Sequence, residues 1–149
     1  MGHTMYKHFL IATDGSELAQ KAVRQGLELA NRLGAKVTAL TVSEPWPVAM
    51  ADGVVVSNPI DDYERAMAQE ASRHLAGVSE LARDLGVPCE TMHLPDQYPA
   101  DGIVEQANAK GCDLIVMASH GRRGIAKLLL GSQATRVLTH SAIPVLICK

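Results

Sequence analysis

Aromatic side chains are scarce in this sequence. They make up 3% of its 149 residues, with one Trp and one Phe, although 47% of the residues are hydrophobic. The core is therefore expected to be built from Val, Leu, Ile, Ala and Met. No apolar run approaches the roughly 20 residues of a membrane-spanning helix, and the polar start resembles no secretory signal peptide. These absences predict a cytoplasmic protein that does not associate with membranes.

An excess of charge of one sign is also lacking. The 14 basic and 16 acidic residues give a formal net charge of −2, which argues against binding to nucleic acid. The three cysteines, Cys89, Cys112 and Cys148, are odd in number and lack metal-ligand spacing. They are expected to be buried free thiols rather than redox or metal-binding groups. The length predicts one domain over residues 1–149, with residues 1–4 a candidate cloning remnant.

Apolar, β-branched runs alternate with stretches of helical periodicity along the chain. We expect strands at 7–13, 35–43, 87–94, 114–117 and 143–148. We expect helices after the N-cap Ser16, from Asp61 to Gly86, at 99–109 and at 132–140. This alternation is typical of an α/β fold, a doubly wound five-stranded parallel sheet with helices on both faces. Right-handed crossovers favour the strand order 3-2-1-4-5.

The expected strand order reverses between the first and fourth strands. In such sheets ligands bind beside the reversal, at the carboxyl ends of the strands. The first strand ends at Ala12-Thr13-Asp14 and the fourth at Met117-Ala118-Ser119. These two short segments are therefore expected to lie side by side at a binding site.

A glycine-containing stretch follows the run at 114–117. Gly121 and the pair Gly131-Ser132 are separated by nine residues, and a helical pattern starts at Ser132. Glycines let the backbone turn its N–H groups toward an anion, and a helix N-terminus adds unpaired donors. The stretch is neither a Walker A loop nor a dinucleotide fingerprint. It predicts a phosphate seat in which Ser132 either caps the helix or gives its hydroxyl to a phosphate oxygen.

This spacing resembles the nucleotide loop of the universal stress protein family, written G-x2-G-x9-G-[S/T]. Ala118 stands at its first glycine, Gly121 at its second, and Gly131-Ser132 at its last pair. The resemblance implies an adenine nucleotide alpha hydrolase-like fold that binds ATP with Mg²⁺ and hydrolyses it slowly or not at all. It also implies a stress-response role and a homodimer formed through the C-terminal strand, Ile143–Cys148.

The resemblance also implies a role for individual residues. Those expected to contact the nucleotide are Ala12, Thr13 and Asp14 at the ribose and phosphates, Val42 at the adenine through its backbone, Met117 and Ala118 at the base and ribose, and Gly121, Arg122, Gly131, Ser132 and Gln133 at the phosphate chain. Asp14 could take a ribose hydroxyl or face a metal through water. The alternative for Asp14 is to cap the first helix.

Other interpretations stay open at this point. The protein could be a dimeric interaction module of the same fold that binds no nucleotide, and the alanine at position 118 favours that alternative. We predict at most a weak ATPase without catalytic residues, because Ser119 and His120 are neighbours that rarely align as nucleophile and base. We expect no protein metal site, because His74 and His93 have no partner spacing. The Pro-containing segment 44–60 is either a flap beside the ligand or a dimer contact.

Overall fold

The computed structural model describes residues 5–45, 59–121 and 129–149. In chain order its elements are β1 (His8–Ala12), α1 (Glu17–Leu33), β2 (Lys36–Val42), α3 (Pro59–Leu85), β3 (Cys89–Leu94), α4 (Pro99–Ala109), β4 (Leu114–Ala118), α5 (Ser132–His140) and β5 (Val145–Cys148). All five strands were predicted, and the observed strands differ from the predicted ones by one or two residues at their ends. Residues 46–58 of the Pro-containing segment lie outside the described residues.

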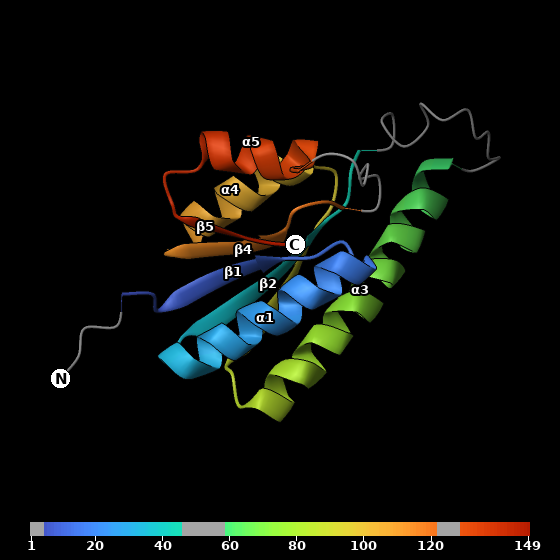
Figure 1. The fold of residues 1–149 in the computed structure, drawn as a ribbon. Coiled ribbons are helices and arrows are strands. Elements are labelled where there is room, and N and C mark those ends of the chain that lie inside the picture. The colour runs from blue at the N-terminus through green and yellow to red at the C-terminus, as the bar shows by residue number, and fades with distance from the viewer. Residues whose placement is uncertain (1–4, 46–58, 122–128) are drawn as a thin grey trace.

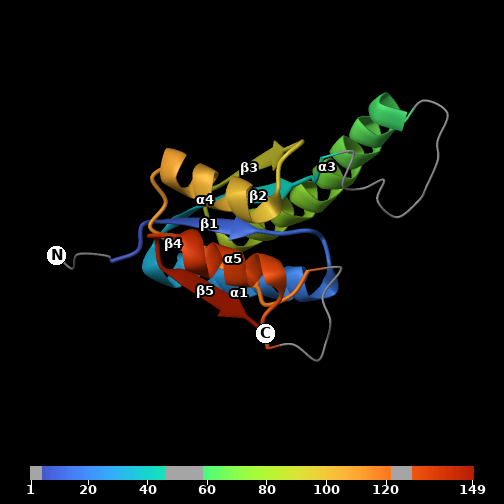
Figure 2. The same ribbon diagram turned by 90° about the horizontal axis from the view of Figure 1, so that it is seen from above.

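The strands form one parallel sheet in the order β3-β2-β1-β4-β5, which confirms the prediction. Helices α1 and α3 cover one face, and α4 and α5 cover the other (Figure 1). Seen from above, β3 and β5 form the two edges of the sheet (Figure 2). The order reverses between β1 and β4, so the site expected there is where the fold places a binding crevice.

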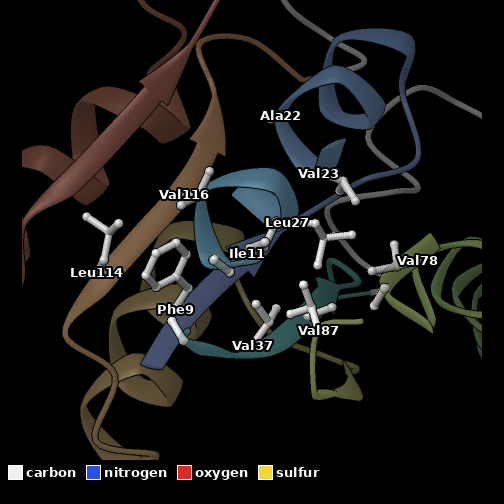
Figure 3. Close-up of a cluster of buried hydrophobic side chains, with 14 of the residues drawn as sticks. Phe9, Ile11, Ala22, Val23, Leu27, Val37, Val78, Val87, Leu114 and Val116 are labelled. Atoms are coloured by element: carbon white, nitrogen blue, oxygen red, sulfur yellow. The ribbon is translucent and has the colours of Figure 1, made fainter. Parts of the chain in front are cut away.

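Strands β1 and β4 are buried on both faces, which explains their largely apolar sequences. Phe9 and Ile11 of β1 face α1, and Leu27 of α1 packs with them, as Figure 3 shows. Leu10 and Ala12 of the same strand belong to the cluster under α4 and α5. The core is aliphatic as expected, with Phe9 as its one fully buried aromatic side chain among the described residues.

The ends of the helices follow local signals in the sequence. The Ser16 hydroxyl accepts a hydrogen bond of 3.2 Å from the Ala19 N–H, and Gly34 ends α1 in the left-handed region at φ 67°. Helix α3 begins at Pro59, two residues before the predicted Asp61. Proline suits a first helical turn because the N–H it lacks would be unpaired there. The segment after β2 is therefore shorter than predicted.

The structure agrees with the prediction that the cysteines are free thiols. All three are free, Cys112 and Cys148 are buried, and Cys89 is half-buried. Burial raises the pKa of all three thiols, that of Cys112 to about 11, so the reactive thiolate is disfavoured. Within the three described ranges, no helix combines the length and the apolar character needed to cross a membrane.

Two helical glycines offer a matched test of the packing. A Cβ at Gly26 would lie 2.7 Å from Ile11 Cδ1 and 3.2 Å from Val116 Cγ1, whereas one at Gly77 would meet open space. We expect Gly77→Ala to raise the free energy of unfolding by about 0.5–1 kcal/mol. We expect Gly26→Ala to lower it by about 1 kcal/mol, because overpacking outweighs the same helical gain. Urea unfolding measures both, and a stabilised Gly26→Ala protein would contradict this view of the α1–sheet contact.

Candidate functional site

A cleft of about 590 Å³ opens at the carboxyl ends of the central strands. Its lining includes every predicted site residue that the structure describes: Ala12, Thr13, Asp14, Val42, Met117, Ala118, Gly121, Gly131, Ser132 and Gln133. Arg122 was also predicted, and it lies outside the described residues. The structure therefore brings together residues that are more than 100 positions apart in the sequence.

The loops after β1 and β4 touch each other, as the strand order requires. A Cβ at Gly121 would lie 2.6 Å from Asp14 Oδ2, so only a glycine lets the Asp14 carboxylate pack so closely there. The other carboxylate oxygen, Oδ1, accepts the Ser16 N–H at 2.9 Å. Ser16, not Asp14, caps α1. The alternative role predicted for Asp14 is therefore wrong, and its carboxylate lines the cleft.

The N-terminus of α5 provides backbone donors beside the cleft. Gly131 is the N-cap and has no side chain to cap the helix, while its own N–H donates to the Ser119 carbonyl at 2.7 Å. The N–H groups of Ser132, Gln133 and Ala134 consequently have no acceptor within the helix. Ser132 is the first helical residue and does not cap α5, so one of its two predicted roles is wrong. Its hydroxyl stays a candidate ligand for a phosphate.

Gln133 has a structural task that the sequence did not reveal. Its side-chain Oε1 accepts the Ala100 N–H at 3.0 Å, in the first turn of α4. This bond ties the N-terminus of α4 to that of α5 and uses the amide oxygen. A contact between Gln133 and a phosphate would then be made by its N–H groups.

The end of β2 exposes backbone groups to the cleft. Residues of β2 bond alternately to β1 and β3: the Leu40 carbonyl accepts from Thr13 on the β1 side, and the Ser43 N–H donates to Leu94 on the β3 side. By this alternation the N–H and C=O of Val42 point toward β1, which has already ended at Ala12. No backbone bond joins Val42 to that side among the described residues. A donor and an acceptor therefore lie next to each other at the cleft.

The Thr41 side chain explains why the backbone hydrogen bonds between β1 and β2 end at Thr13. Its hydroxyl donates to the Thr13 carbonyl at 2.9 Å, and that carbonyl is the next acceptor on the β1 side. The bond also holds the β1 exit against β2. Both residues are buried, with Thr13 7% and Thr41 6% exposed. The separation of the ends of β1 and β2 is thus set by a side-chain hydrogen bond.

The alanine at position 118 adds little bulk to the cleft. The residue is 8% exposed and belongs to the core cluster on the α1 side of the sheet. Met117, 7% exposed, belongs to the opposite cluster and lines the cleft from the α4 side. The departure from the glycine pattern is therefore compatible with a ligand.

Helix α3 forms a wall of the cleft that sequence reasoning missed. The lining residues of this helix are Tyr63, Met67, Glu70, Ala71 and His74. The Tyr63 hydroxyl donates to the Glu44 carbonyl at 2.7 Å and ties α3 to the β2 exit. The His74 ring packs directly against Gly15, whose φ is 78°. The signal was present in the helical spacing of these positions, but the spacing alone also fits ordinary core packing.

Ser119 and His120 both line the cleft. Ser119 is 3% exposed, and its hydroxyl contacts His120 Nδ1 at 3.1 Å. His120 Nε2 is buried and has no hydrogen-bond partner within the described part of the chain. The prediction that these two cleft residues are not catalytic stays a prediction.

The described residues hold no group of three or more His, Cys, Asp or Glu side chains that could bind a metal ion by themselves. The described lining of the cleft contains the carboxylates of Asp14, Glu44 and Glu70 and no Lys or Arg. The sequence places Arg122, Arg123 and Lys127 between the two glycines that border the cleft, outside the described residues.

The sequence of the chain matches known proteins along nearly its whole length. Residues 5–149 match the model of the Universal stress protein family. The chain is 33% identical over 148 residues to Universal stress protein MJ0531 of Methanocaldococcus jannaschii, an alignment that covers 99% of this chain and 85% of the relative.

Solved structures agree with this match. The structure of MJ0577, also from Methanocaldococcus jannaschii, superposes with a TM-score of 0.80 at 26% identity and covers 97% of this chain and 96% of that one. A universal stress protein in complex with cAMP superposes with a TM-score of 0.70 at 25% identity, covering 97% and 98%. The sequence match, the sheet order and the cleft agree, and this chain belongs to the universal stress protein family.

Proposed function

We propose that the cleft binds an adenine nucleotide, with ATP as the preferred ligand, and that ligand occupancy sets the state of a stress-response regulator. The observation that carries the proposal is that two recognition features built from backbone face one cleft. The N-terminus of α5 suits phosphates, and the N–H and C=O of Val42 suit a base. The related protein in complex with cAMP, itself an adenine nucleotide, supports this choice.

The backbone of Val42 favours adenine over guanine. Adenine presents an acceptor at N1 beside a donor at N6, which matches one N–H and one C=O. Guanine presents a donor and an acceptor in the reverse order. Buried polar groups that would be left unpaired disfavour the wrong base. We therefore expect ATP to bind more tightly than GTP.

Mg²⁺ would accompany the nucleotide rather than occupy a protein site. This ion is usually held by one or two carboxylates together with phosphates and water. The Asp14 carboxylate lines the cleft beside Gly121, so the residues present fit that mode of binding. The ion would neutralise phosphate charge next to the acidic residues of the cleft.

Binding rather than turnover is the proposed activity. Ser119, which lines the cleft beside His120, is only 3% exposed, and this low exposure favours binding over attack by its hydroxyl. We propose slow hydrolysis at most, in a cytoplasmic protein whose three free thiols suit a reducing compartment.

The direct test is mass spectrometry of small molecules released from the purified, denatured protein, followed by calorimetric titration with ATP and with GTP in Mg²⁺. We expect an adenine nucleotide in the first experiment and tighter binding of ATP in the second. Absence of both released nucleotide and ATP binding would favour the alternative, a dimeric interaction module with an empty cleft. The observation that favours this alternative is that three carboxylates, those of Asp14, Glu44 and Glu70, line the cleft and would repel phosphates.

One substitution separates ligand binding from folding. Ser132 is exposed and is the first residue of α5. A carboxylate at this position interacts favourably with the helix dipole and stabilises the fold by about 0.3–1 kcal/mol. The same carboxylate repels a phosphate bound at this N-terminus. We expect Ser132→Glu to weaken ATP binding at least about tenfold, with an unchanged or higher melting temperature.

The matched control is Thr139→Glu, which adds the same charge to an exposed position of the same helix, seven residues further on. It should bind ATP like the parent protein. If Ser132→Glu also binds ATP like the parent, the phosphates do not lie at α5.

We further propose that two copies associate through β5. The edge of this strand has no partner within the described residues. Its bonds to β4 use Pro144 and Cys148, so by alternation the N–H and C=O of Val145 and Ile147 point outward. Leu146 of β5 and Leu138 of α5 are 38% and 41% exposed. An exposed apolar edge favours pairing with another strand, and a C₂ dimer would cover it.

We expect Leu146→Lys to convert a dimer to a monomer, because each copy would place a charge at the joined edges. Sedimentation velocity measures the change. Leu146 is the one exposed residue of β5, so the fold should tolerate lysine at this position. Ile60→Lys, at a 52% exposed position of α3, is the control and should stay dimeric. A Leu146→Lys protein that sediments as a dimer would rule out this interface.

A further inference from the structure

A hydrogen bond links the proposed base-binding end of the cleft to the outside of the sheet. Ser43 follows Val42 directly, lines the cleft and is 8% exposed. Its hydroxyl oxygen lies 2.7 Å from Nε2 of His93, on the edge strand β3. His93 does not line the cleft; it lines a separate groove of about 360 Å³ between α3 and β3. The bond therefore joins two different cavities.

The direction of this bond follows from the burial of Ser43. A buried hydroxyl hydrogen that finds no acceptor costs free energy, which favours its donation to a nearby acceptor. Among the described residues, the side-chain partner of the Ser43 hydroxyl is His93 Nε2. Ser43 therefore donates and Nε2 accepts, which assigns the neutral imidazole its hydrogen on Nδ1. Only a neutral histidine can accept in this way.

The surroundings of His93 keep it neutral. None of the other residues that line its groove, from α3 or from β3, carries an ionisable side chain. On the β2 side its neighbours are Thr41, its partner in the strand register, and Ser43. Burial lowers the pKa of His93, with no neighbouring charge to oppose that effect. The acceptor form is therefore the one present at neutral pH.

Ser43 is also held through its backbone. Its N–H donates to the Leu94 carbonyl at 3.0 Å, and its carbonyl accepts from the Gln97 N–H at 3.1 Å. These bonds fix the chain to the β3 side, and the His93 bond fixes the side chain to the same side. Val42, one residue earlier, must then present its N–H and C=O to the opposite side, which is the cleft.

We propose that His93 is a positioning residue of the nucleotide site: by accepting the Ser43 hydroxyl from outside the cleft, it holds the Val42 backbone in the orientation that selects adenine. This inference rests on the proposed function. Since His93 does not itself line the cleft, it acts through the Ser43 hydroxyl. Removing the acceptor should weaken binding of the matching base more than binding of a mismatched one.

The test uses full-length protein and calorimetric titration with MgATP and MgGTP. His93→Phe keeps a ring but removes the acceptor, and we expect it to weaken ATP binding about 3–10-fold, the usual effect of one hydrogen bond. The ratio of the dissociation constants for GTP and ATP should fall, because GTP does not use the Val42 pattern. His93→Gln, which retains an acceptor oxygen, should restore both values to within about twofold of the parent.

A thermodynamic cycle shows whether the effect passes through Ser43. Ser43→Ala should weaken ATP binding by a similar factor, and the double variant should bind no worse than either single variant. Ser43→Ala also carries the test alone if His93→Phe does not fold, which its melting temperature would show. Multiplicative losses in the double variant would mean that the two residues act independently, contrary to the proposal.

The pH dependence provides a second readout. Protonated His93 cannot accept, and its pKa is lowered from the ordinary value by burial, so ATP affinity of the parent should fall by more than that of His93→Gln as the pH decreases through that lowered pKa. Parallel pH profiles would overturn the proposal, as would equal losses of ATP and GTP binding in His93→Phe. A parent protein that binds no ATP would defeat the proposed function itself. A parent that binds ATP, with variants that match it, would defeat only the role of His93.

Discussion

The early end of β1 is the constraint on which the rest of the cleft depends. β1 stops at Ala12, while its neighbour β2 continues to Val42 and the strand order reverses on the other side at β4. The Thr41 hydroxyl closes the β1 ladder at Thr13. Backbone groups that a longer strand would have paired are left at the carboxyl end of the sheet. A hydrogen-bonding surface is thereby built from main chain rather than from side chains.

Burial of both faces of the sheet confines ligand binding to its ends. Helices pack against both faces of β1 and β4, whose residues are all buried, so these faces have no room for a ligand. The parallel crossovers bring the N-termini of α1, α4 and α5 to the carboxyl end of the sheet, as Figure 2 shows. The Gln133–Ala100 bond joins two of these termini. Positive ends of helix dipoles therefore gather where the proposed phosphates would lie, although the described lining itself is acidic.

Local signals in the sequence were sufficient for most of the fold. Ser16 and Gly34 mark the ends of α1 because a hydroxyl cap and a left-handed residue act within one helical turn. Pro99 marks the start of α4 for the same local reason. The glycine spacing predicted two residues that line the cleft, Gly121 and Gly131, each of which packs against backbone or a carboxylate that a side chain would displace. The signal failed at α3, where Tyr63 and His74 have the spacing of ordinary core residues but line a cleft.

The sequence by itself determined the alternation of strands and helices, the strand order and the two loops that meet at the site. These follow from periodicity, from caps and from the handedness of crossovers, which depend on neighbouring residues. Only the tertiary structure decided that Gly131 rather than Ser132 caps α5, that the Gln133 side chain binds α4, and that Ser43 bonds to His93. Each of these depends on which distant groups come within about 3 Å, a distance that the packing of the sheet and its helices sets and that no local pattern encodes.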